Sequence, residues 1–441
     1  MRDIVLTAFI LGSLPFILRN PFIGLLMWVW VGIMNPHRFT WGFAYNMPFA
    51  QIIAICTVAS MLLHQDKRFS MPKDKVVIFL VLFLLWLGVS PFFSFHPDRE
   101  FAHWIEPVKI QVMCLVALFL VGRRDQLHNL VWVLALSIGL FGIKGGIFTI
   151  AHGGAYRVWG PPGSFIADNN ALALAIIMTM PLFRYLQLYT ENRWIRRACV
   201  VAMLLCFISA LGSYSRGALL AVLAMGLFLF VKSRKKGLIV ILILVCAPIV
   251  FTLMPEAWFD RMSTIETYQQ DASALGRINA WHMCWNLAVA RFPIGGGFVI
   301  YEPDVFARYA PEPWNIHAAH SIYFQVLGEH GFIGLALYLL IFGLSWRNGS
   351  WIVRNTKNVA GLEWARDLAS MCQVSLAGFA VGGAFLSLTY FDLPYYLVII
   401  LIVLRQLVAR QLAGSASDST DKASAGTGSL VAPDVAKKVP A

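Results

Sequence analysis

The stretch "VVIFLVLFLLWLGV" at residues 76–89 is apolar at every position, and the apolar run continues to Phe93. A helix of roughly 17 to 25 such residues crosses the hydrocarbon core of a bilayer. The run lacks the alternation of apolar and polar residues that is typical of a strand in a transmembrane barrel. We therefore predict a membrane-spanning helix that faces lipid here.

The rest of the chain follows the same pattern. Hydrophobic residues make up 59% of the 441 residues and charged residues 13%, a balance outside the range of soluble domains. Similar runs occur at 4–18, 21–35, 49–63, 108–121, 129–150, 170–186, 196–212, 217–232, 238–254, 322–346, 367–390 and 394–411. The sequence predicts an all-α polytopic membrane protein with about twelve transmembrane helices.

Lysine and arginine alternate between rich and poor loops, and this pattern predicts the orientation. Seventeen of them fall in the loops around residues 67–75, 123–124, 193–197, 232–236 and 347–366, which we place in the cytoplasm. The intervening short loops contain only Arg38, Arg99, Arg157 and Arg216, which we place outside.

The N-terminal stretch "MRDIVLTAFILGSLPFILRNP" (1–21) has no cleavage site followed by a soluble chain, so we interpret it as a retained helix. The runs 4–18 and 21–35 are each too short for a full crossing. We expect them to be two half-helices of one crossing, joined at residues 19–21, with a cytoplasmic N-terminus. The alternative is an external N-terminus and thirteen crossings.

The remaining composition excludes other classes of function. The net charge of +12 comes from the predicted cytoplasmic loops, so it does not indicate a nucleic-acid partner. The cysteines show neither a disulfide framework nor a metal-ligand spacing. We predict a bundle over 1–254, an external loop over 255–320, further spanning helices over 321–411 and a disordered cytoplasmic tail over 412–441, where Ala, Ser, Gly and Thr dominate.

The long loop 255–320 contains a segment that predicts an interfacial amphipathic helix over residues 274–291. Ser273 is a suitable N-cap, and Pro293 follows the end. Arg277 falls in the first turn, where the helix dipole disfavours a cation. An anionic partner, from the protein or from a ligand, is therefore expected at Arg277.

Arg216 in "LGSYSRGALLA" (211–221) and Arg157 in a Gly- and Pro-rich loop are two further arginines on the predicted external side. Ser215 and the glycine after Arg216 permit close approach at a helix N-terminus, which favours an anion. Three external arginines indicate a polyanion such as a pyrophosphate, because guanidinium groups bind it bidentately. The alternative for Arg216 is an interaction with lipid phosphates.

The stretch "IHAAHSIYFQVLGEHG" (316–331) places several ionisable groups where a hydrophobic run begins. His320 is the candidate for a reactive group, whereas His317 and His330 are expected to be structural. Glu329 falls about two turns into the helix, so we expect it to form a hydrogen bond or ion pair within the bundle. The alternative for His320 is an interfacial cap without chemistry.

Three stretches together resemble the signature motifs of the O-antigen ligase superfamily. They are "SYSRGALLA" (213–221), "ALGRINAW" (274–281) followed by "PIGGGF" (293–298), and "AHSIYFQVLGEHGFIGLALY" (319–338). The resemblance covers residues 170–345, and the pattern of the chain is also similar to the branch described as exosortase-associated O-glycosylation ligases.

The resemblance implies an enzyme of the bacterial inner membrane with its active site facing the periplasm. It would move a preassembled glycan from undecaprenyl pyrophosphate to an acceptor hydroxyl, without a metal or other cofactor, and with inversion. Lipid A-core is the acceptor we favour; protein O-oligosaccharyltransferases and Wzy-type polymerases are the alternatives. His320 would be catalytic, and Arg216 and Arg277 would bind the pyrophosphate with Arg157. Supporting roles would fall to Tyr214, Ser215, Ser321, Tyr323, Gln325 and Glu329.

Two other classes make different demands on the sequence. A metal-dependent oligosaccharyltransferase needs acidic ligands for a hard cation, for which the pairs Asp98 with Glu100 and Glu302 with Asp304 are candidates. A transporter of lipid-linked glycans, which is not an enzyme, is expected to place polar groups near mid-membrane on broken helices.

Overall fold

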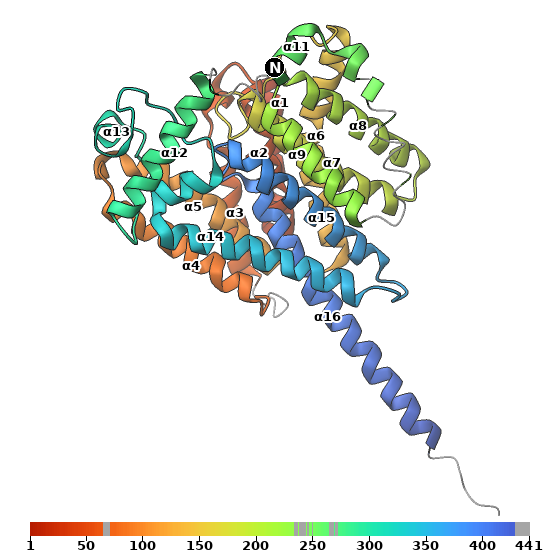
Figure 1. The fold of residues 1–441 in the computed structure, drawn as a ribbon. Coiled ribbons are helices and arrows are strands. Elements are labelled where there is room, and N and C mark those ends of the chain that lie inside the picture. The colour runs from red at the N-terminus through yellow and green to blue at the C-terminus, as the bar shows by residue number, and fades with distance from the viewer. Residues whose placement is uncertain are drawn as a thin grey trace, which may run out of the picture.

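The computed structural model describes residues 1–64, 71–232, 237, 244, 247–248, 250–263, 269 and 272–427, and these residues form a bundle of helices with no strand among them (Figure 1). Nine of the described α-helices are α4 (Lys75–Val89), α5 (Pro97–Leu120), α6 (Arg124–Ala151), α7 (Asn169–Tyr189), α8 (Arg193–Gly212), α9 (Arg216–Lys232), α14 (Ile322–Asn355), α15 (Glu363–Gly382) and α16 (Asp392–Thr427). The others are α1 (Arg2–Arg19), α2 (Pro21–Met34), α3 (Phe49–Leu63), α11 (Glu256–Ser263), α12 (Ala272–Ala290) and α13 (Pro303–Tyr309).

Within the described part of the chain, eight helical segments are long and apolar enough to cross a membrane, and three shorter apolar helices accompany them. The prediction of an all-α polytopic membrane protein is confirmed at this level. The number of crossings stays a prediction. Most of the run 238–254, which we expected to be a span, lies outside the described residues.

Helices α1 and α2 form an antiparallel hairpin, so the predicted pair of half-helices in one crossing is wrong. The rings of Phe9 and Trp30, near the middle of the two helices, lie 5.6 Å apart. The carboxylate of Asp3 accepts hydrogen bonds from the backbone N–H groups of Gly42 and Ala44, beyond the end of α2. The chain therefore turns back at Asn20, whose side chain caps α2.

The hairpin brings the N-terminus to the same side as residues 36–46. The loop that contains Arg38 is on the lysine- and arginine-poor side of the bundle. With this arrangement, the distribution of basic residues favours the external N-terminus, which was the alternative in the sequence analysis.

Small residues allow the central helices to approach each other closely. A Cβ atom added at Gly146 of α6 would lie 2.2 Å from the backbone carbonyl oxygen of Leu205 in α8. A Cβ atom at Gly145 would lie 2.2 Å from the Ser209 hydroxyl oxygen. Such contacts are typical of helix pairs in membranes, where association depends on close packing. Helix α16 runs through the interior, with its side chains from Leu393 to Leu404 buried.

The predicted amphipathic helix 274–291 is present as α12. It begins at Ala272, so Ser273 lies in its first turn and is not the N-cap. Its buried face packs on the start of α14, where Gly328 allows the close approach of Cys284. Helices α12 and α13 lie together at one end of the bundle (Figure 1).

At the other end of the chain, α16 continues through Thr427, into the segment 412–441 for which we predicted no folded structure. Residues 428–441 lie outside the described part of the chain. The cytoplasmic location of this segment stays a prediction.

Helix α14 is broken at Gly331, which has φ 66° and ψ −165°. The break leaves carbonyl groups without partners inside the helix, and a second segment supplies the donors. The N–H of Gly296 donates to the carbonyl oxygen of Gly328 (2.9 Å), and the N–H of Gly297 donates to that of Glu329 (3.0 Å). The indole N–H of Trp86 donates to the carbonyl oxygen of His330 (2.9 Å). The segment after α12 and the start of α14 are therefore joined by their backbones.

We expect Gly331→Ala to destabilise the protein, because an L-residue at this φ and ψ costs about 1–3 kcal/mol. The new Cβ would also lie 2.4 Å from the carbonyl oxygen of Pro293. The matched control is Gly343→Ala in the same helix, where no atom lies within 4 Å and the change gains roughly 0.8 kcal/mol of helix propensity. Thermal unfolding of both purified variants measures the difference. A Tm for Gly331→Ala at or above that of the control would contradict this account of the break.

Candidate active site

The turn between α8 and α9 is fixed by side chains that bond to backbone groups. Tyr214 has a positive φ of 58°, and its hydroxyl donates to the carbonyl oxygen of Gly154 (2.8 Å). The amide of Asn169 at the start of α7 donates to the carbonyl oxygen of Ser213 (2.7 Å). Ser215 accepts a hydrogen bond from the N–H of Ala218 and so caps α9. Arg216 is thereby placed in the first turn of α9.

Arg157 belongs to the loop that packs against this turn. Its guanidinium carbon lies 5.8 Å from the ring centre of Tyr214. Burial raises the pKa of the Tyr214 hydroxyl, and the nearby Arg157 partly opposes this shift. Arg157 therefore lies near Tyr214, in the same motif as Arg216. This is compatible with the predicted group of three arginines.

The starts of α9 and α12 meet at one short turn, η5 (Gly383–Phe385). A terminal nitrogen of Arg277 lies 3.5 Å from the carbonyl oxygen of Phe385. A Cβ atom added at Gly217 would lie 3.7 Å from the Cβ of Phe385. Arg277 therefore contacts this turn, and Gly217, the residue after Arg216, lies beside it.

His320 is held just before α14 in a left-handed backbone conformation, with φ 43°. The indole N–H of Trp281 donates to the carbonyl oxygen of Ala319 (2.6 Å), and the same indole stacks on Phe324 at 5.1 Å. Helix α12 therefore positions both Arg277 and the backbone next to His320.

The half-buried imidazole of His320 is close enough to several charged or ionisable groups for them to affect its pKa. Burial lowers this pKa most, and Arg277 and His317 lower it further, while Asp168 at the start of α7 acts in the opposite direction. The imidazole is accordingly neutral at neutral pH and can accept a proton.

The supporting residues predicted from the sequence are mostly bonded within the protein. Ser321 is buried at the N-cap of α14, and the hydroxyl of Tyr323 donates to the carbonyl oxygen of Ala380 (2.8 Å). The amide of Gln325 donates to a carboxylate oxygen of Glu329 (3.0 Å) and accepts from Thr389. These side chains stabilise the structure around His320 through hydrogen bonds and packing.

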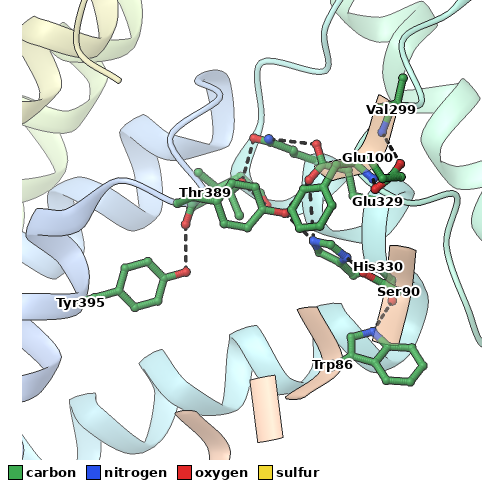
Figure 2. A network of polar contacts seen from close by, with 12 residues as sticks. Trp86, Ser90, Glu100, Val299, Glu329, His330, Thr389 and Tyr395 are labelled. Atoms are coloured by element: carbon green, nitrogen blue, oxygen red, sulfur yellow. Dashed lines mark hydrogen bonds and ion pairs between the residues drawn. The ribbon is translucent and has the colours of Figure 1, made fainter. Parts of the chain in front are cut away.

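A buried polar network surrounds Glu329 and His330 of α14, as Figure 2 shows. The hydroxyl of Tyr390 donates to Glu329 and contacts Nε2 of His330. On the opposite side of the imidazole, Nδ1 of His330 lies 2.8 Å from the hydroxyl of Ser90. Glu329 thus forms the hydrogen bonds within the bundle that we expected for it. The network joins α4, α14 and the segment before α16.

Three of the four acidic residues that we considered as ligands of a hard cation, Glu100, Glu302 and Asp304, form other contacts. Glu100 accepts from the N–H groups of Phe298 and Val299 and from the Ser94 hydroxyl, so it holds the glycine-rich segment after α12. Glu302 pairs with Arg99 at 2.6 Å, and Asp304 contacts His96 at 3.2 Å. In the part of the chain that the structure describes, no three His, Cys, Asp or Glu side chains form a group that could hold a metal.

Sequence reasoning missed Asp168, Ser90, Trp86 and Tyr390. Asp168 follows a Gly- and Pro-rich loop and caps α7, because it accepts from the N–H groups of Asn170 and Ala171. The others lie in or beside apolar runs. A polar or hydroxyl-bearing residue within such a run is the signal that could have indicated them.

The fold and the site define a multi-pass helical membrane protein with a cationic site at one end of its bundle. Residues 201–339 match the O-antigen ligase family, and residues 1–191 match a family of unknown function (DUF5935). No curated protein matches the chain. The match to this family over residues 201–339 confirms the resemblance that the three motifs carry.

We expect Tyr390→Phe to destabilise the protein, because it removes the hydroxyl that bonds one carboxylate oxygen of buried Glu329 and Nε2 of buried His330, at about 1–3 kcal/mol per unsatisfied group. Tyr338→Phe is the matched control, since the buried hydroxyl of Tyr338 has no hydrogen-bond partner among the described residues. Thermal unfolding should show a lower Tm for Tyr390→Phe and an unchanged or higher Tm for Tyr338→Phe. Equal Tm values for the two variants would show that the network contributes no stability.

Proposed function

We propose that this chain is a glycosyltransferase of the O-antigen ligase type, which moves a preassembled glycan from undecaprenyl pyrophosphate to an acceptor hydroxyl at the periplasmic face of the bacterial inner membrane. The observation that carries the proposal is the convergence of the three motifs. Arg277 contacts the turn η5, and Gly217, next to Arg216, lies beside the same turn. Arg277 is also near enough to His320 to lower its pKa.

An apolar cavity beside this convergence supports a lipid-linked donor. It has a volume of about 660 Å³ and lies between α9, α14 and α15. Its lining extends from Ile322 and Tyr323, which follow His320 closely in sequence, to Val231 and Trp346, which are further along α9 and α14. A polyprenyl chain in this cavity would place its pyrophosphate beside the arginines.

The proposed step is a single displacement. The acceptor oxygen attacks the anomeric carbon and forms the new glycosidic bond, while its proton goes to the neutral imidazole of His320. The bond between the anomeric carbon and the phosphate oxygen breaks, and its electron pair leaves on undecaprenyl pyrophosphate. Arg216 and Arg277 stabilise that negative charge, with Arg157 nearby. Attack from the face opposite the leaving group inverts the anomeric centre.

Lipid A-core is the acceptor that we propose. Transfer to a protein hydroxyl or to a growing glycan would use the same site, so product analysis with each acceptor distinguishes a ligase from an oligosaccharyltransferase or a polymerase. A lipid-linked glycan transporter would give no covalent product in the same assay.

We expect His320→Ala to reduce transfer by about 10²- to 10⁴-fold, which is the usual contribution of a general base. The test is single-turnover transfer by purified protein with a defined undecaprenyl-pyrophosphate glycan, in the presence of EDTA. His152→Ala is the control, because His152 is exposed and bonds locally to the carbonyl oxygen of Phe148. Full turnover in His320→Ala would remove His320 from the mechanism, and a requirement for added magnesium would refute metal independence.

The pH dependence of transfer follows from the lowered pKa of His320. A general base acts in its neutral form, so activity is retained as the pH falls until it reaches this lowered pKa. The acidic limb of the rate profile should therefore lie below the ordinary histidine pKa of about 6.5. Arg277→Gln removes a cation that lowers the pKa, and it should move the limb to higher pH, whereas Arg216→Gln should leave it in place. A limb that does not move in Arg277→Gln would contradict the assignment.

The two motif arginines should contribute to different steps. Arg216 is fixed in a capped turn between two long helices, so Arg216→Ala should mainly weaken donor binding. Arg277 lies on α12, outside the spans, and Arg277→Ala should mainly slow transfer at saturating donor. Each loss should be about ten- to a hundredfold, from about 1.5–3 kcal/mol per charge-assisted contact. Lysine should not fully replace either residue, because it lacks the bidentate guanidinium.

Donor binding and single-turnover rates of both alanine variants measure this division. Normal binding and normal rates in both variants, or an exchange of the two effects, would rule out the division.

A further inference from the structure

A second cationic site lies in the N-terminal part of the chain, apart from the three motifs. Residues 38–41 and Tyr45 line a cavity of about 560 Å³ together with Arg2 of α1 and Lys144 of α6. Arg2, Arg38 and Lys144 are therefore the charged residues of one cavity, although they come from three separate segments. The hairpin of α1 and α2 brings Arg2 to this place.

The three cations are not explained by membrane insertion. Arg38 belongs to a loop on the side of the bundle that is poor in lysine and arginine, and the shared cavity puts Arg2 on that same side. Insertion favours the opposite distribution. Lys144 lies within a predicted span, seven residues before the end of α6, where a charged group usually has a functional partner.

Among the described residues, those that line the cavity carry no counter-charge. No carboxylate is among its lining residues. The carboxylate of Asp3, next to Arg2, is engaged by the backbone N–H groups of Gly42 and Ala44. Nε of Arg38 is buried and has no hydrogen-bond partner among the described residues. Like-charged groups gathered without an anion create a site that an external anion would stabilise.

Aromatic rings shape the same cavity. The guanidinium carbon of Arg38 lies 4.7 Å from the ring centre of Tyr45, and the ammonium of Lys144 lies 5.8 Å from that of Phe39. These contacts orient the two cations. Trp41 at the rim is 86% exposed, and an exposed indole beside apolar helices is typical of the membrane interface.

We propose that this cavity binds the phosphate of an anionic lipid headgroup in the outer leaflet. The surroundings of Lys144 favour a lipid over a free phosphate. Leu140 and Ile147 lie on the same face of α6, one turn to either side, and they are 46% and 56% exposed. Val5 on α1, one turn from Arg2, is 67% exposed. The cations therefore lie next to exposed apolar surfaces on which acyl chains can lie.

This site is separate from the transfer site, so the proposal does not rest on the proposed function. It does touch the loop that leads to the transfer site. A Cβ atom added at Gly163 would lie 3.2 Å from the guanidinium carbon of Arg38, and the same loop contains Arg157 and ends at Asp168. An occupied headgroup site would hold this loop in place.

The experiment measures lipid retention by the full chain in detergent, using native mass spectrometry. Phosphatidylglycerol and phosphatidylcholine with identical acyl chains are offered together, without any glycan donor. We expect the protein to retain phosphatidylglycerol about tenfold better, from the charge-assisted contacts. Arg38→Gln with Lys144→Gln should abolish this preference. Lys144→Gln alone, at an exposed position, should reduce it severalfold without a change in Tm.

Arg308→Gln is the matched control, because Arg308 is an exposed cation on α13, outside the cavity. Its preference should equal that of the unmodified chain. Equal retention of the two lipids, or an equal loss in Arg308→Gln, would overturn the proposal. Displacement of phosphatidylglycerol by millimolar inorganic phosphate would assign the cavity to a free phosphate and would overturn the lipid assignment.

Discussion

The hydrogen bonds across the break in α14 are the interaction on which the candidate site depends. A helix broken within a bundle exposes backbone carbonyl groups, and each unpaired group costs several kcal/mol where water is absent. Here the N–H groups of Gly296 and Gly297 and the indole of Trp86 supply the donors. Glycine is required on both sides, because Cβ atoms at Gly295 and Gly331 would lie 2.4 Å from backbone atoms of the facing segment. The glycine-rich stretch after α12 and the stretch "GEHG" are therefore two halves of one structure.

These hydrogen bonds, which we call the joint, connect the parts of the candidate site. It fixes the start of α14, and Trp281 of α12 bonds to the carbonyl oxygen next to His320. Helix α12 also carries Arg277, which reaches the turn η5 beside the start of α9. Glu100 bonds to the glycine-rich segment of the joint. The network of Glu329, Tyr390 and His330 holds the part that belongs to α14. The polar groups of the break thus maintain a geometry that apolar packing alone leaves unspecified.

The parts of the fold and of the candidate site that depend on local sequence patterns were predictable from the sequence. Apolar runs predicted helices, and the predicted amphipathic helix 274–291 agrees with α12 to within two residues at its start. The motifs gave His320, Arg216 and Arg277 as candidates. The hairpin of α1 and α2 was not predicted, because the length of an apolar run does not show whether the next helix continues in the same direction or folds back. The contact of Asp3 with residues 42–44 decides it, and this contact joins residues about 40 positions apart. Tyr390 and Trp86 were missed for the same reason, since a tyrosine or tryptophan in an apolar run has no pattern until its partner is placed.

We propose that the joint at α14 places Arg216, Arg277 and His320 around one pyrophosphate. An experimental structure of the full chain with undecaprenyl pyrophosphate tests it most directly. The account predicts that the pyrophosphate contacts Arg216 and Arg277 beside η5, within reach of His320, with the prenyl chain in the cavity between α9, α14 and α15. A pyrophosphate bound elsewhere, with the three side chains out of its reach, would contradict the account.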